Sequence, residues 1–380
     1  MAGYRRAVAA IDRADINTST LDQMQYELLY LGNGVDVEPQ RGLLRAKLLI
    51  AENRYMAALE QLSIAESTDE TRVRALVLAG EALYRDGRFR EAGAAWVRAT
   101  QLDPQNVNAY RWLGVAYYEL GTVDAAMHYL QEVAKLVPTD PRPHRVMGVI
   151  WRDLDEFHNS AEAYRESLER DSTSSLSDEV RFEYAQVLSS SQEHAKALEA
   201  IRQLPSTADV LALRATCLYG LGQLDEAARL LDQVIEEQPE HFPALVSRTK
   251  IALERSEHDL ATKLSRRAGE LKPKSPETLN LLIATYLREG NREKAKQCEQ
   301  ELLDVSNRLD AYHDLVSRAS ADPSDDDLRF RAGTLAAELG MKEAATWWLR
   351  AAVFLDPNNE AARRALDRLS DGRNLWQSLQ

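Results

Sequence analysis

Residues 107–140 read VNAYRWLGVAYYELGTVDAAMHYLQEVAKLVPTD, and this stretch decides the predicted fold of the whole chain. Its apolar residues recur three and four positions apart on both sides of Gly121, which is the spacing of two amphipathic helices joined by a turn. Glycine adopts the left-handed conformation at a helix end without a clash, and Pro138 cannot continue a helix. The stretch is therefore predicted to be one helix–turn–helix unit.

A constant period relates this stretch to the rest of the chain. Gly80, Gly114 and Gly148 are 34 positions apart, and so are Pro104 and Pro138. Several residue types that share one period indicate a repeat protein. We therefore predict an all-α solenoid of antiparallel helix pairs, in place of the two or three globular domains that 380 residues would otherwise suggest.

The period also divides the chain into segments. We predict N-terminal capping helices or a degenerate repeat at 1–38, a helical insertion and acidic loop at 310–325, and a capping helix with a tail at 360–380. The predicted repeats are 39–72, 73–106, 107–140, 141–174, 178–206, 208–241, 242–275, 276–309 and 326–359. Within a repeat, small residues such as Gly80 are predicted to let the two helices approach closely, with Trp96 filling the space beside them.

The composition excludes several classes of protein. Charged residues make up 28% and apolar residues 44%, and no run of about 18 apolar residues predicts a membrane-spanning helix. The two cysteines, Cys217 and Cys298, are too few for a disulfide framework or a cysteine-bound metal cluster. The net charge of −13 argues against nucleic acid as a ligand, because phosphate binding needs a basic surface. Arginine outnumbers lysine 37 to 10, which is typical of GC-rich bacterial genomes.

No catalytic constellation is evident. The seven histidines do not pair at helical spacing, and neither a glycine-rich phosphate loop nor a nucleophile elbow occurs. Asp325, Asp326 and Asp327 are read as the capped start of a helix rather than a calcium loop, because the distal glutamate is missing. We expect a chain that is not an enzyme and has no cofactor or metal.

The repeat resembles the tetratricopeptide repeat (TPR) family over about residues 39–359. The resemblance rests, in residues 107–140, on Leu113, Gly114, Tyr117, Gly121, Ala126 and Pro138. It implies a right-handed superhelix whose first helices line a concave groove. We predict that the chain is a non-catalytic scaffold that binds a peptide or protein segment in this groove. Chaperone-binding members carry a lysine–asparagine clamp, and the matching positions here hold Arg111 with Val115 and Arg145 with Val149. Chaperone tails are therefore not expected partners.

The resemblance also indicates which side chains would line the groove. In residues 73–174 these are Arg74, Tyr84, Arg85, Arg111, Trp112, Tyr118, Arg142, Arg145 and Arg152. Arginine offers a fixed fork of donors to a carboxylate, and aromatic rings supply contact area with few rotors to freeze. We predict a protein or peptide partner, with an acidic segment favoured. The alternative is an ordinary groove with pairs inside the chain, such as Arg85 or Arg152 with Glu119 or Asp153.

A second candidate surface lies near the C-terminus. Trp347 and Trp348 are adjacent on a predicted helix, so they point in different directions, and Trp376 follows in the tail. We predict that one of the pair packs inside while the other joins Trp376 in a patch for homodimerisation or docking. The alternative is that residues 360–380 cover both.

Two broader alternatives stay open. The chain is either a free-standing interaction scaffold or the accessory repeat region of a larger enzyme or of a cell-envelope or secretion assembly. An RNA reader is disfavoured, because such proteins place a regular polar code on a basic face. We expect a cytoplasmic location, and a periplasmic or membrane-anchored one if the chain is a piece of a longer protein.

Overall fold

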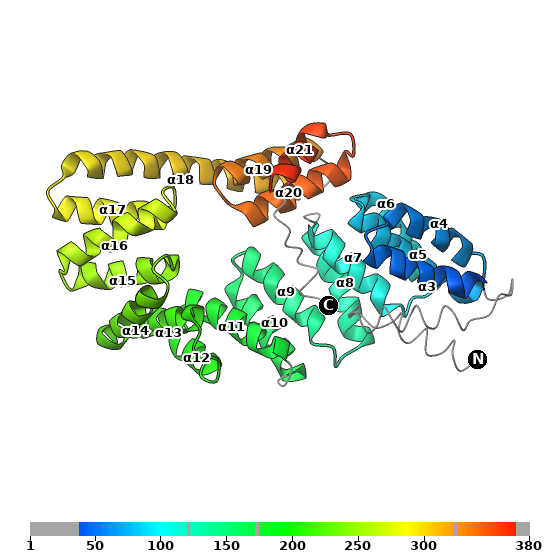
Figure 1. Ribbon diagram of the computed structural model, residues 1–380, viewed down its shortest axis with the longest axis horizontal. Helices are drawn as coiled ribbons and strands as arrows, with labels where there is room; N and C mark the ends of the chain where they lie inside the picture. The colour runs from blue at the N-terminus through cyan, green and yellow to red at the C-terminus, as the bar shows by residue number, and fades with distance from the viewer. Residues whose placement is uncertain (1–37, 120–121, 172–174, 323–324, 370–380) are drawn as a thin grey trace. The chain divides into compact units, whose positions relative to one another are not determined.

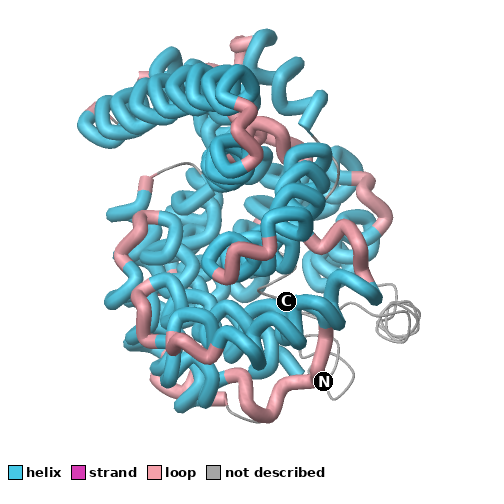
Figure 2. Tube along the Cα trace, turned by 90° about the vertical axis from the view of Figure 1, so that its left-hand side faces the viewer, coloured by secondary structure: helices cyan, strands magenta, loops and turns pink. Residues whose placement is uncertain are grey.

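The computed structural model describes residues 38–119, 122–171, 175–322 and 325–369, which are helical and contain no strand (Figures 1 and 2). The helices are α3 (Glu38–Ala51), α4 (Tyr55–Ala65), α5 (Asp69–Arg85), α6 (Phe89–Leu102), α7 (Val107–Glu119), α8 (Val123–Leu136), α9 (Arg142–Asp153), α10 (Phe157–Arg170), α11 (Ser175–Ser190), α12 (His194–Ala200), α13 (Ala208–Gly220), α14 (Leu224–Glu237), α15 (Phe242–Glu254), α16 (His258–Leu271), α17 (Pro276–Arg288), α18 (Arg292–Ala321), α19 (Asp326–Glu338), α20 (Lys342–Leu355) and α21 (Glu360–Leu369). The predicted all-α array of paired helices is confirmed. The predicted N-terminal caps and the tail with Trp376 lie outside the described residues.

The helices form two compact units. Unit 1 comprises Met1–Pro138, Arg318–Thr334 and Lys342–Gln380, and unit 2 comprises Thr139–Ser317 and Leu335–Met341. Consecutive helices pack in pairs, such as α5 with α6 in unit 1 and α15 with α16 in unit 2. The first helix of a pair also contacts the first helix of the next pair, as α3, α5 and α7 do in unit 1 and α11, α13, α15 and α17 do in unit 2. We call the surface of these odd-numbered helices the first-helix face of each unit.

A single left-handed residue forms the turn inside each pair whose turn is described. These residues have φ between 58° and 81°, and they are Asn53, Gly87, Asp155, Gln192, Gly222, Ser256, Gly290 and Gly340. The next residue donates its N–H to the carbonyl five positions back, as Arg88 does to Leu83 at 2.8 Å. The predicted turn at Gly121 lies outside the described residues, and Gly87, one period earlier, has the left-handed conformation that the same reasoning predicts.

Glycines allow the helices of a pair to approach closely. A Cβ on Gly80 would overlap the indole ring of Trp96, and one on Gly114 would lie 2.9 Å from the side chain of Leu130. The predicted close approach at Gly80, with Trp96 beside it, is confirmed.

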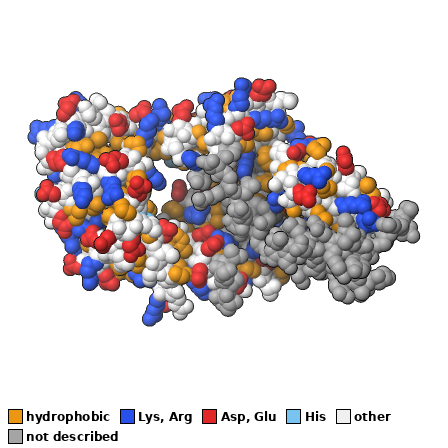
Figure 3. Space-filling model, in the orientation of Figure 1, with side chains coloured by type: hydrophobic (Ala, Val, Ile, Leu, Met, Phe, Trp, Pro, Cys, Tyr) orange, Lys and Arg blue, Asp and Glu red, His pale blue; other side chains and the backbone are white. Residues whose placement is uncertain are grey.

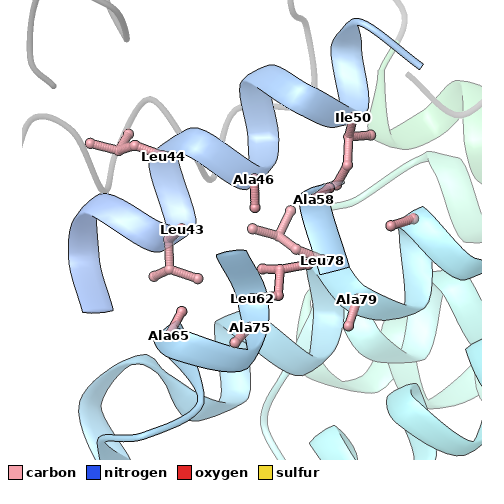
Figure 4. Close-up of a cluster of buried hydrophobic side chains, with 11 residues drawn as sticks. Leu43, Leu44, Ala46, Ile50, Ala58, Leu62, Ala65, Ala75, Leu78 and Ala79 are labelled. Atoms are coloured by element: carbon pink, nitrogen blue, oxygen red, sulfur yellow. The ribbon is translucent and has the colours of Figure 1, made fainter. Parts of the chain in front are cut away.

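The core of each unit is built from alanine and leucine. In the cluster from α3, α4 and α5, Leu43 and Leu62 lie among alanines such as Ala46 and Ala65, and all four are at most 1% exposed (Figure 4). Small alanines beside larger leucines let neighbouring helices pack closely.

The stretch predicted as an insertion lies mostly in one long helix. α18 is continuous over 30 residues, so residues 310–321 extend the second helix of a pair. Asp325 then accepts the backbone N–H of Leu328 at 2.9 Å, which caps the start of α19. In the described part of the chain, no helix has the length and apolar character needed to cross a membrane.

Candidate functional site

The residues predicted to line the groove lie on the first helices α5, α7 and α9. Six belong to unit 1 and three to unit 2. Each group is therefore described within its own unit.

Two of the aromatic residues in unit 1 belong to the core. Tyr84 is 7% exposed and Trp112 is 5% exposed. The ring of Trp112 stacks on the ring of Trp96, with the two ring centroids 5.0 Å apart. The ring centroids of Tyr84 and Trp112 lie 5.7 Å apart. Their rings join α5, α6 and α7, so their contact area is used inside the chain, and their part in binding stays a prediction.

Two of the predicted arginines of unit 1 have partners on their own helices. Arg85 Nη2 lies 3.0 Å from Glu81 Oε1, and Arg111 Nη1 donates to Asn108 Oδ1 at 3.1 Å. Burial raises the pKa of Glu81, against the opposing charges of Arg85 and Lys47. Arg85 therefore has a partner inside the chain, and this partner is Glu81, which the sequence alternative did not name.

Arg145 of unit 2 is the most enclosed of the predicted arginines that have a described ion pair. It is 7% exposed and forms a two-pronged pair with Glu183, Nε to Oε2 at 3.1 Å and Nη2 to Oε1 at 2.8 Å. Nη2 also reaches Glu179 Oε2 at 3.1 Å. Burial disfavours the charge on Arg145, but the hydrogen bonds and charges of the two carboxylates outweigh burial and raise its pKa. Arg145 thus ties α9 to α11, the first helix of the next pair.

The other two arginines of α9 are paired close by in sequence. Arg142 Nε lies 2.9 Å from Asp140 Oδ1, and Arg152 Nη2 lies 3.0 Å from Asp153 Oδ1. The alternative pairing of Arg152 with Asp153 is confirmed. Figure 3 likewise shows acidic and basic side chains interspersed over the visible face. The charges of the three predicted arginines of α9 are therefore offset by carboxylates of the chain itself.

The tryptophans of α20 have different surroundings. Trp348 is buried at 2% exposure, whereas Trp347 is half-buried. Trp347 donates its indole N–H to the backbone carbonyl of Tyr118, and the two ring centroids lie 5.9 Å apart. One residue of the predicted groove and one of the predicted patch are therefore in contact within unit 1. Helix α7 covers part of Trp347, which neither sequence alternative included.

Sequence reasoning missed the two carboxylates on Arg145. A signal for one was available, because Glu179 occupies the same slot as Arg145 one period later. Burial raises the pKa of both Cys217 and Cys298, which disfavours the reactive thiolate form of each. Over the residues with described side chains, no cluster of three His, Cys, Asp or Glu is arranged to hold a metal ion.

Known proteins share the repeat. The family model for the tetratricopeptide repeat matches residues 43–106, 77–141 and 213–276. The chain is 24% identical over 170 residues to anaphase-promoting complex subunit 3 of Schizosaccharomyces pombe. The matched segment covers 45% of this chain and 25% of that protein. The chain thus spans about a quarter of the length of this curated relative.

Solved structures with similar helical arrays include two bacterial proteins. A tetratricopeptide repeat protein from Parabacteroides merdae is 17% identical with a TM-score of 0.45, covering 65% of this chain and 98% of that one. PilF from Pseudomonas aeruginosa is 16% identical with a TM-score of 0.45, covering 56% of this chain and 97% of that one.

Proposed function

We propose that this chain, which carries tetratricopeptide repeats, is a non-catalytic scaffold that binds a protein or peptide segment on its first-helix face. The repeat is a general protein-interaction fold. The finer proposal is that the α9–α11 part of unit 2 receives an acidic segment through Arg145.

The unequal exposure of the two carboxylates on Arg145 is the observation that supports this proposal. The side chain of Glu183 is 21% exposed and holds Arg145 through two parallel hydrogen bonds, whereas the Glu179 side chain is 62% exposed and makes one. Nη1 of Arg145 is buried and has no hydrogen-bond partner among the described residues. A buried donor without a partner is unfavourable. An incoming carboxylate that replaces Glu179 would bind Nη2 and reach Nη1, while Glu183 keeps the guanidinium in place.

An array of acidic, neutral and basic peptides tests this exchange. We expect Glu179→Gln to strengthen binding of acidic peptides, because it removes the competing carboxylate, and Arg145→Glu to abolish that binding. Arg165→Glu is the matched control, since Arg165 lies on α10 and pairs with Glu162. If Arg145→Glu leaves the bound peptides unchanged, the site is elsewhere, and Arg111→Glu then examines unit 1.

A second function is a subunit role in a larger assembly. The similarity to a subunit of the anaphase-promoting complex favours it. The native mass of the chain in an extract of its source cells tests this role. A mass equal to that of the free chain would count against it.

Two further parts of the proposal concern location and self-association. We propose a cytoplasmic location, which cell fractionation tests. In a homodimer through the C-terminal region, Trp347 would leave Tyr118 of its own chain and contact a second copy of the protein. Equal sedimentation masses for the wild type and Trp347→Ala would remove the homodimer.

A further inference from the structure

Two hydrogen bonds join α20 to α6 and α7 within unit 1, and both end on carbonyls at helix C-termini. The indole of Trp347 donates to Tyr118 in the last turn of α7, and Arg90 of α6 donates to Leu355, the last residue of α20. The last four carbonyls of a helix have no partner inside the helix, and a cation is favoured at that end. Each contact therefore satisfies a group that the helix alone leaves open.

The surface that α20 covers is one that the proposed function would use. Tyr118 lies on a first helix, and it occupies the slot that Tyr84 holds one period earlier. Tyr118 is 5% exposed with α20 in place. An external segment that contacts Tyr118 must therefore displace Trp347. Trp347 is half-buried, and the buried residues Leu349 and Ala352 of α20 lie in a cluster with Ala362 of α21 that contains no residue of α6 or α7.

We propose that α20 is an internal occupant of this surface, which includes Tyr118 on the first-helix face of unit 1 and Arg90 on the neighbouring helix α6, and that its release opens this surface to a partner. The surface, which we call the α20 seat, consists of Tyr118 and Arg90. It accepts a helical segment that carries a tryptophan and ends in a free carbonyl eight positions later, as Trp347 and Leu355 do. Those two points lie about 12 Å apart along a helix. This inference rests on the proposed function, since it assumes that the first-helix face binds protein segments.

A synthetic peptide of residues 342–359 supplies the occupant from outside. The fluorescently labelled peptide is titrated into the full chain as wild type, Trp347→Ala and Trp347→Phe. The added peptide can bind only to molecules whose α20 seat is empty, so an internal occupant weakens the apparent affinity for the peptide. We therefore expect Trp347→Ala, which loosens the internal occupant, to bind the peptide about tenfold more tightly than the wild type. Trp347→Phe keeps a smaller aromatic ring and loses the N–H donor, so its gain in affinity should be smaller than that of Trp347→Ala.

Variants of the seat distinguish this surface from any other. In the Trp347→Ala chain, Arg90→Ala should weaken peptide binding, because Arg90 donates a hydrogen bond to the peptide carbonyl that corresponds to Leu355. Arg98→Ala is the matched control on the same helix, where Arg98 pairs with Glu66. A peptide that carries the Trp347→Ala change should not bind.

Equal binding to the wild type and to Trp347→Ala would overturn the inference, as would binding to neither. Trp347→Phe decides if the alanine variant fails to fold. The peptide array with Arg145→Glu reports on unit 2 alone, so a failure of the α20 seat is distinguishable from a failure of the proposed function.

Discussion

Gly80 and Trp96 meet at the closest approach of α5 and α6. The indole of Trp96 donates its N–H to the carbonyl of Val77 at 3.1 Å, and its Nε1 occupies the space where a side chain at position 80 would begin. Trp96 is fully buried and stacks on Trp112 of the next pair. The missing side chain at one position therefore fixes how two repeats pack.

Gly80→Ala should lower the free energy of unfolding by about 1–3 kcal/mol, because the added methyl overlaps the indole of Trp96. Gly93→Ala on α6 is the control, since a Cβ there meets no atom within 4 Å. That variant should gain up to about 1 kcal/mol from helix propensity. Chemical denaturation measures both changes, and a loss of equal size in the two variants would contradict the steric explanation.

Ser256→Gly should raise the free energy of unfolding by about 0.5–1 kcal/mol, because Ser256 has a left-handed φ of 59° that glycine adopts without strain. Gly222→Ala should lower it by a similar amount, since Gly222 has a φ of 78° and open space around its Cα. Thermal or urea unfolding checks the opposite signs. Two changes of the same sign would show that the backbone conformation does not control stability at these turns.

Arg145→Ala should lower the free energy of unfolding by about 1–3 kcal/mol, because it leaves the Glu183 carboxylate without its two charge-assisted donors. Glu179→Gln should lower it by less than about 1 kcal/mol, since that side chain is mostly exposed. Urea denaturation of both single variants and of the double variant measures the coupling. Equal losses in the two single variants would argue against Glu183 as the main partner.

The pH dependence of stability should include a contribution from His144. Burial, together with the charge of Arg170, lowers its pKa, and this outweighs the carboxylates of Glu166 and Asp140. The unfolded chain then binds a proton near pH 6.5 that the folded chain binds only at lower pH, so stability falls as the pH drops below about 6.5.

Denaturation at pH 7.5 and 5.5 checks this contribution. His144→Gln should lose less stability between the two pH values than the wild type does. His158→Gln, whose side chain is exposed in the same helix pair, is the control and should behave like the wild type. A wild-type pH dependence that His144→Gln leaves unchanged would assign the effect to other groups.

Much of the fold follows from the period of the sequence, because each repeat makes its main contacts with itself and its neighbours. Gly80 and Gly87 were predictable, since their roles depend on residues within one unit. The ion pair between Arg145 and Glu179 was also predictable, but only by comparing the charges at equivalent positions of adjacent repeats.

The contact between Trp347 and Tyr118 was not predictable from the period. The two residues are 229 positions apart, which is no multiple of the repeat, and no local pattern relates them. The prediction that one of the two tryptophans of α20 packs inside is confirmed for Trp348, but it did not include α7 as a partner of Trp347. Burial of Trp112 was missed for a related reason, because its partner Trp96 sits in the preceding repeat.

The closed turns have a consequence for how a gene of this kind changes in length. Each left-handed turn is completed by backbone atoms close to it in sequence, and Gly80, Gly114 and Gly148 each face a large side chain on the second helix of their own pair. A duplicated DNA segment of one period therefore encodes a complete turn, and it also encodes both the glycine and the large side chain that packs against it. Such an insertion requires no compensating substitution inside the new block, and evolution can lengthen or shorten the array in whole periods.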